Sequence, residues 1–192
     1  MKEFLFLLPS KMARLHWISI LVVLELLFLW AFNGLFPFSI FKLKELSGGL
    51  GMPDENLFYS YNQLFRLFDQ YGASGRALYL KLQWIDMGYP VVYSLLLGSL
   101  LAVFCKNSRF AWMMLLPFLA AVFDLTENIL LRIGVLSFPN LDSALVQVAS
   151  MATFLKWVML LLTLIALIVG VTARIVLWAK KHNKAVSGVS SN

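Results

Sequence analysis

Four long apolar runs constrain the fold of this 192-residue chain more than any other feature. They extend over residues 17–38, 77–104, 110–131 and 145–177. Each run reaches the ~20 residues that a helix needs to cross ~30 Å of hydrocarbon. Hydrophobic residues make up 60% of the sequence and charged residues 14%, a balance far from that of a soluble domain. The pattern predicts an all-α integral membrane protein, one domain in which four transmembrane helices form a bundle.

The placement of lysine and arginine predicts the orientation of the bundle. Positive residues gather before the first run, between the second and third runs, and after the fourth: Lys2, Lys11, Arg14, Lys106, Arg109, Arg174, Lys180, Lys181 and Lys184. By the positive-inside rule these regions are cytoplasmic, so both termini lie inside and the loop 39–75 lies outside. The first run contains Glu25 and is too long for a signal h-region, so we expect it to be retained. The sequence lacks an N-x-[ST] acceptor, which favours a bacterial inner membrane over a eukaryotic one.

The outer loop contains a helical pattern of its own. After the turn-rich stretch SGGLGMPDEN, apolar residues recur at helical spacing, namely Leu57, Tyr61, Leu64, Phe68 and Tyr71. The pattern predicts an amphipathic helix over about 55–71 that lies in the membrane interface. Such a helix serves either as an anchor packed on the bundle or as a lid over a polar site. The polar tail 180–192 is predicted to be disordered.

Ionisable residues inside the apolar runs indicate where the function lies. They are Glu25, Asp86, Asp124, Glu127 and Lys156. A charged side chain at the centre of a bilayer costs at least ~2.5 kcal/mol, so such residues normally face protein or water. On the second run, helical spacing places Arg76, Tyr79, Gln83, Asp86 and Tyr93 on one side. On the third run, Asp124, Glu127 and Asn128 share a side with small residues that permit close helix contacts.

These polar sides are predicted to meet in one pocket. At ~1.5 Å per residue, Asp86, Asp124 and Lys156 come to a common depth in the outer half of the bundle. Four carboxylates and one lysine cannot all be ionised in a medium of low dielectric constant, so we expect one carboxylate to hold a proton near neutral pH. Such a group can be a general acid, a proton carrier or a buried hydrogen-bond donor. An Asp86–Lys156 ion pair that fixes helix register is the structural alternative.

Several kinds of chemistry are disfavoured at this pocket. The two histidines, His16 and His182, lie at the cytoplasmic helix ends, which argues against a histidine-ligated metal, a haem or a Ser-His-Asp triad. A divalent ion on Asp86, Asp124 and Glu127 stays open, although no ligand spacing supports it. Cys105 is the single cysteine, which excludes an intrachain disulfide. We predict no cofactor, and no nucleic-acid partner because no basic aromatic surface is present.

The layout of four helices, a long first outer loop and membrane carboxylates resembles the EXPERA group of sterol isomerases and sterol-binding receptors. The likeness is one of topology and matches no residue motif, so it assigns no site residue.

Three functions stay open. The preferred one is binding of a membrane lipid or other amphiphilic small molecule. The alternatives are a membrane-embedded acid/base enzyme acting on a lipid, and a small proton-coupled transporter subunit, which would need to form a homo-oligomer.

Overall fold

The computed structural model describes residues 2–34, 38–106 and 108–189, and over these residues the chain folds into helices and connecting segments without a strand. Four helical segments are long and apolar enough to cross a membrane. They are α2 (Leu15–Asn33), α5 (Gly72–Cys105), α6 (Leu116–Ser137) with the short helix η2 (Ala111–Leu115) before it, and α7 (Ser143–Val189). The prediction of an all-α chain with four such helices is confirmed.

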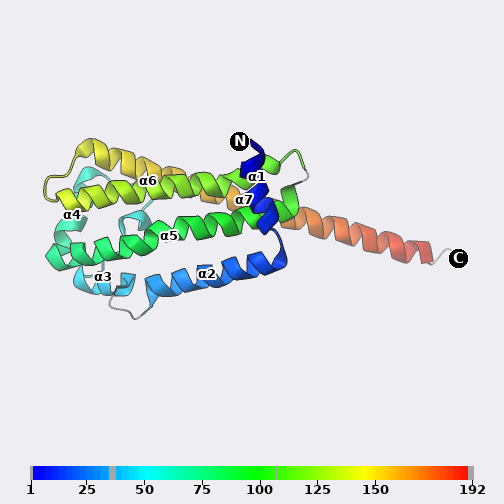
Figure 1. Cartoon of the computed structure of the whole chain (residues 1–192), viewed down its shortest axis with the longest axis horizontal. Coiled ribbons are helices and arrows are strands. Elements are labelled where there is room, and N and C mark those ends of the chain that lie inside the picture. Colours follow the sequence, from blue (N-terminus) through cyan, green and yellow to red (C-terminus); the bar gives the residue numbers. More distant parts are fainter. Residues whose placement is uncertain (1, 35–37, 107, 190–192) are drawn as a thin grey trace.

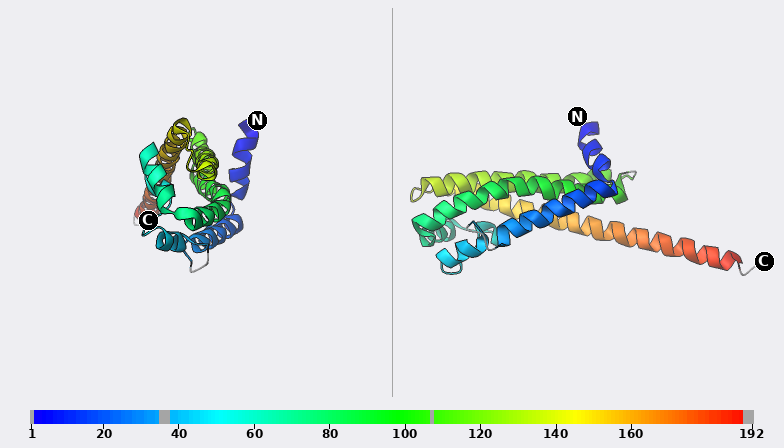
Figure 2. Two further views of the ribbon diagram at one scale, coloured as in Figure 1. Left: turned by 90° about the vertical axis from the view of Figure 1, so that its left-hand side faces the viewer. Right: turned by 60° about the horizontal axis from the view of Figure 1, so that its bottom comes forward.

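The four long helices lie side by side around α5. Helix α2 packs on one side of α5, α6 packs on another, and α7 packs along α6. Figure 1 shows the connections at two opposite ends of this arrangement. The first connection, with α3 (Ile40–Leu46) and α4 (Tyr61–Gln70), lies at one end beside the turn between α6 and α7. The N-terminal helix α1 (Lys2–Met12) and the link between α5 and η2 lie at the other, and α7 continues beyond them (Figure 2).

Several helix ends differ from the predicted ones. Helix α2 ends at Asn33, before the predicted end at residue 38, and residues 35–37 lie outside the described residues. Helix α5 begins at Gly72 rather than at residue 77. Helix α7 extends to Val189 and so includes residues 180–189 of the predicted disordered tail. Residues 190–192 of the predicted tail lie outside the described residues.

The connection between α2 and α5, called the outer connection because the sequence predicts it on the outer side, is more structured than the sequence pattern predicts. It contains α3, the single 3₁₀ turn η1 (Pro53–Glu55) and α4, which is shorter than the predicted helix 55–71. Helix α4 begins with a capping box, in which Ser60 Oγ accepts from the Gln63 backbone N–H and Gln63 Oε1 accepts from that of Ser60. After α4 the chain turns at Gly72, whose φ of 61° is one that glycine adopts readily. This turn leads directly into α5.

Close packing holds the outer connection and α2 against the bundle. Leu64 and Phe68 of α4 are buried with Tyr79 of α5 in an apolar core at the outer end. Further along α5, Gly88 lets α2 come near, since a Cβ added there would stand 3.0 Å from Phe28 Cζ. The buried polar side chains of Gln83 and Asp86 lie on α5 between this apolar core and the Gly88 contact.

Candidate ligand-binding site

A cavity of about 590 Å³ lies among α2, the outer connection and the three remaining long helices. Its volume falls within the range of ~300–1,000 Å³ that is typical of small-molecule sites. Five carboxyl groups line it, from Glu25, Asp54, Glu55, Asp86 and Asp124, together with the ammonium group of Lys156. Four aromatic side chains also line the cavity, namely Phe32, Tyr89, Tyr93 and Trp157.

Lys156 is the centre of an ion-pair network. Its Nζ lies 2.8 Å from Glu127 Oε2 and 3.3 Å from Asp124 Oδ1. A third partner is Asp54, whose Oδ2 also lies 3.3 Å from this nitrogen. The Lys156 side chain is 4% exposed, so three carboxylates share one buried cation. The third and fourth apolar runs were predicted to meet at this depth. They do so where Asp124 and Glu127 contact Lys156.

Asp54 is the member of this network that sequence analysis missed. It belongs to η1, and its backbone carbonyl oxygen accepts from Trp157 Nε1 at 3.3 Å. Tyr71 holds the same segment from the other side, because its hydroxyl donates to the Gly51 carbonyl. The sequence showed Asp54 as one of several loop charges that nearly cancel. The one available signal was its position within the turn-rich stretch SGGLGMPDEN, in a connection long enough to fold back on the helices.

Hydroxyl groups fix the carboxylates of α6. The Tyr93 hydroxyl donates to Asp124 Oδ2 at 3.0 Å, and Thr153 Oγ1 donates to Glu127 Oε1 at 2.6 Å. The Tyr59 hydroxyl lies 3.3 Å from the same Thr153 oxygen. Burial, and then the charge of Glu127, raise the pKa of the Tyr59 hydroxyl above its usual range, so this group stays a protonated donor. Tyr59 and Thr153 were not among the predicted site residues.

Other predicted site residues join α5 to α6 behind the cavity wall. Asn128 Nδ2 donates to the Asp86 backbone carbonyl oxygen at 3.3 Å. Gln83 Nε2 lies 3.2 Å from the Asn128 carbonyl oxygen and 3.2 Å from the Tyr79 hydroxyl. These side chains are 2% exposed or less, and none of the three lines the cavity. They fix the register between the two helices that carry Asp86 and Asp124.

Arg76 lies apart from the cluster with which its helical spacing grouped it. Its guanidinium donates to the Phe68 carbonyl oxygen at 2.8 Å and stacks over the Phe138 ring, 4.4 Å from the centroid. Arg76 does share a side of α5 with Asp86, but it lies ~15 Å further along the axis. At that height it binds the C-terminal end of α4, where a cation is favourable.

Glu25 and Asp86 line the cavity from facing helices. Glu25 Oε1 on α2 accepts from the Tyr89 hydroxyl on α5 at 2.7 Å. Asp86 stands one turn before Tyr89 on the same face of α5 and is 5% exposed. The ion pairs of Lys156 are with Asp54, Asp124 and Glu127, so the predicted alternative of an Asp86–Lys156 pair does not describe this arrangement.

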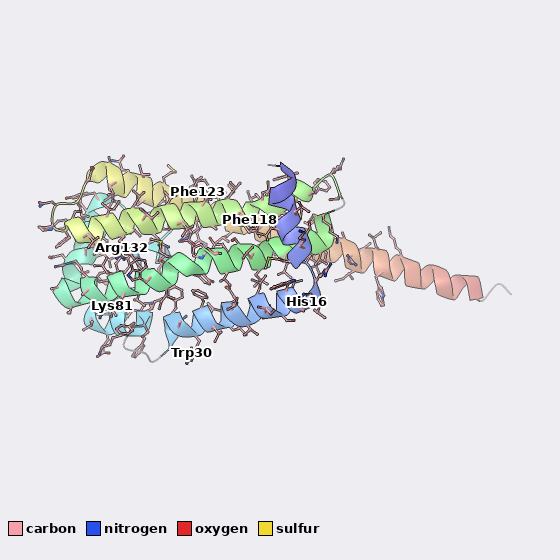
Figure 3. All side chains as sticks on the ribbon, in the orientation of Figure 1. His16, Trp30, Lys81, Phe118, Phe123 and Arg132 are labelled. Carbon is pink, nitrogen blue, oxygen red and sulfur yellow. The ribbon has the colours of Figure 1, made fainter. Side chains whose placement is uncertain are left out.

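The four long apolar helices are compatible with a multi-pass integral membrane protein, and a charged cavity lies among them. His16 lies near the start of α2, at the end opposite α3 and α4 (Figure 3). Within the described residues, no group of three or more histidine, cysteine, aspartate or glutamate side chains is arranged to hold a metal ion. Comparison of the chain with family models, curated proteins and solved structures found no match in any of the three.

Proposed function

We propose that this protein is a four-helix bundle of the bacterial inner membrane that binds a lipid or other amphiphile in the cavity. Both termini are cytoplasmic in this proposal, and the polar end of the ligand lies beside Asp86, Asp124 and Lys156. The positive residues near the two termini and in the link after α5 support the orientation.

The observation that carries the proposal is the change of polarity along the cavity. At the level of Asp86 the wall is charged, whereas Leu97 lies ~16 Å further along α5 and belongs to an apolar part of the wall. Leu160 of α7 also lines the cavity and packs in the same apolar cluster as Leu97. A wall that is charged at one end and aliphatic at the other matches a molecule with a polar head and an apolar chain.

Helix α4 and the exposed residues before it are proposed to lie in the membrane interface. Leu64 and Phe68 are buried on the bundle, while Asn62 is exposed on the opposite side. Leu57 and Phe58 are 57% and 53% exposed, which supports contact with the apolar edge of the interface. In the same connection, Asp54 covers Lys156, so this segment combines the roles of anchor and lid.

Native mass spectrometry of the purified protein in an uncharged detergent tests the proposal. The wild type is expected to retain a small molecule, which the measured mass identifies. Leu97→Trp fills the apolar part of the cavity and should abolish retention. Leu119→Trp places the same side chain on an exposed position of α6 and should leave retention intact. A wild-type protein that retains nothing and takes up no added amphiphile would rule the function out.

A further inference from the structure

The cavity wall carries far more negative than positive groups. Among the described residues that line it, Lys156 bears the one cationic side chain, against five carboxyl groups. Glu55 has a partner outside the cavity, since its Oε1 lies 3.0 Å from Lys44 Nζ. The charge of Lys156 is already shared by Asp54, Asp124 and Glu127. Glu25 and Asp86 therefore line the cavity without a cation of their own.

Other basic residues near this level point away from the cavity. Lys81 Nζ stands over the Phe38 ring, 4.8 Å from its centroid. The Arg132 guanidinium stands over the Trp84 ring at 4.6 Å, and Trp84 is 68% exposed. Figure 3 labels Lys81 and Arg132, which lie toward the end that carries α3 and α4. Neither residue lines the cavity, so neither offsets the charge of Asp86.

Asp86 is the group that indicates a missing partner. It is 5% exposed and lines the cavity, and within the described residues its Oδ2 has no hydrogen-bond partner. The same holds in the described part of the chain for Oε2 of Glu25, whose other oxygen accepts from Tyr89. A buried carboxyl oxygen without a hydrogen-bond partner raises the free energy of the folded protein. A ligand that donates a hydrogen bond to this oxygen removes much of that penalty, which favours binding.

We propose that the ligand of this cavity is an amphiphile with a cationic ammonium headgroup, which binds beside Asp86 and Glu25. This inference rests on the function proposed above and adds the chemical class of the headgroup. An ammonium group neutralises buried carboxylates that lack a counter-charge. The Tyr89 and Tyr93 rings, with centroids 5.4 Å apart, line the same wall and attract cations through their faces.

The same charges argue against the other headgroups. A carboxylate or phosphate headgroup would stand among like charges in a partly desolvated site, which is strongly unfavourable. An uncharged hydroxyl headgroup could donate to Asp86 but would leave the excess negative charge unbalanced. The ammonium headgroup is thus the class that satisfies both the hydrogen-bonding and the charge requirement.

Three ligands with one chain test the inference on the full-length protein in maltoside micelles. Decylammonium, decanol and decanoate differ in the charge of the headgroup, and isothermal titration calorimetry gives their affinities. The cationic ligand should bind about tenfold or more tightly than decanol, a difference of the size of one charged hydrogen bond. Decanoate should bind most weakly. Equal affinities for the three would overturn the inference and leave the amphiphile function standing, whereas binding of none would remove both.

Matched variants locate the headgroup. Asp86→Asn should lower the affinity for decylammonium about tenfold while leaving that for decanol unchanged. Asp69→Asn changes an exposed carboxylate on α4 and should affect neither ligand. Glu25→Gln provides a second variant at a less buried position, which keeps the test valid if Asp86→Asn does not fold. If the folded variants prefer the cationic ligand over decanol as strongly as the wild type does, these carboxylates do not bind the headgroup.

Discussion

Asp54 in the outer connection contacts Lys156 in the membrane-spanning part of α7, with 3.3 Å between Oδ2 and Nζ, although the two residues are 102 positions apart. This contact places a loop residue at the depth of the buried carboxylates. Asp54 and Lys156 both line the cavity, so the contact forms part of its wall. The position of η1 and the charge balance of the cavity are therefore linked.

Replacing Asp54 by asparagine should loosen the outer connection without unfolding the bundle. The Asp54 side chain is 27% exposed and Lys156 keeps two other carboxylates, so the loss of stability should stay within ~1 kcal/mol. Hydrogen exchange of the amides around η1 should become faster. Glu45→Gln breaks the exposed Lys42–Glu45 pair on α3 and serves as the control. Unchanged exchange in Asp54→Asn would mean that the pair does not hold the segment.

Replacing Lys156 by methionine should strongly destabilise the protein. The change leaves Asp124 and Glu127 buried without their counter-charge, at a cost of about 3–5 kcal/mol. Adding Glu127→Gln should recover part of the stability, since Glu127 Oε2 lies closest to Nζ at 2.8 Å. A double-mutant cycle measured by unfolding in mixed detergent should give a coupling above ~0.5 kcal/mol. Strict additivity would contradict the network.

Replacing Leu64 by glutamate should release α4 from the bundle. Leu64 is 1% exposed in the apolar core that includes Leu131 and Val146, and this core cannot solvate a carboxylate. Limited proteolysis should then cut within 57–71 while the four long helices stay protected. Asn62→Glu introduces the same charge on the exposed side of α4 and should leave the digest as in the wild type. Identical digests for both variants would argue against docking of α4.

Cysteine labelling should confirm the proposed orientation. The single native cysteine is first removed by Cys105→Ala. A cysteine introduced at Asn62 should then react with a membrane-impermeant maleimide in intact cells, because α4 lies on the outer side in the proposal. A cysteine introduced at Ser108, an exposed residue of the link between α5 and η2, should react after permeabilisation. The opposite pattern would invert the topology.

The sequence by itself determined the four long apolar helices and the carboxylates that they bury. Both follow from local properties, since the length of an apolar run sets its ability to span a membrane and helical spacing sets which side chains share a face. Asp86, Asp124 and Lys156 could be placed at one depth for this reason. The coarse fold therefore required no knowledge of how the helices pack.

The tertiary structure decided which polar residues meet and which lie apart. Asp54 joins Lys156 because the outer connection folds back over the helices, and Arg76 leaves the cluster because it binds the end of α4. Tyr89 enters the site because α2 packs on α5 and brings Glu25 to its hydroxyl. Contacts of this kind depend on the path of the chain between distant residues, and no local pattern of hydropathy or charge encodes that path.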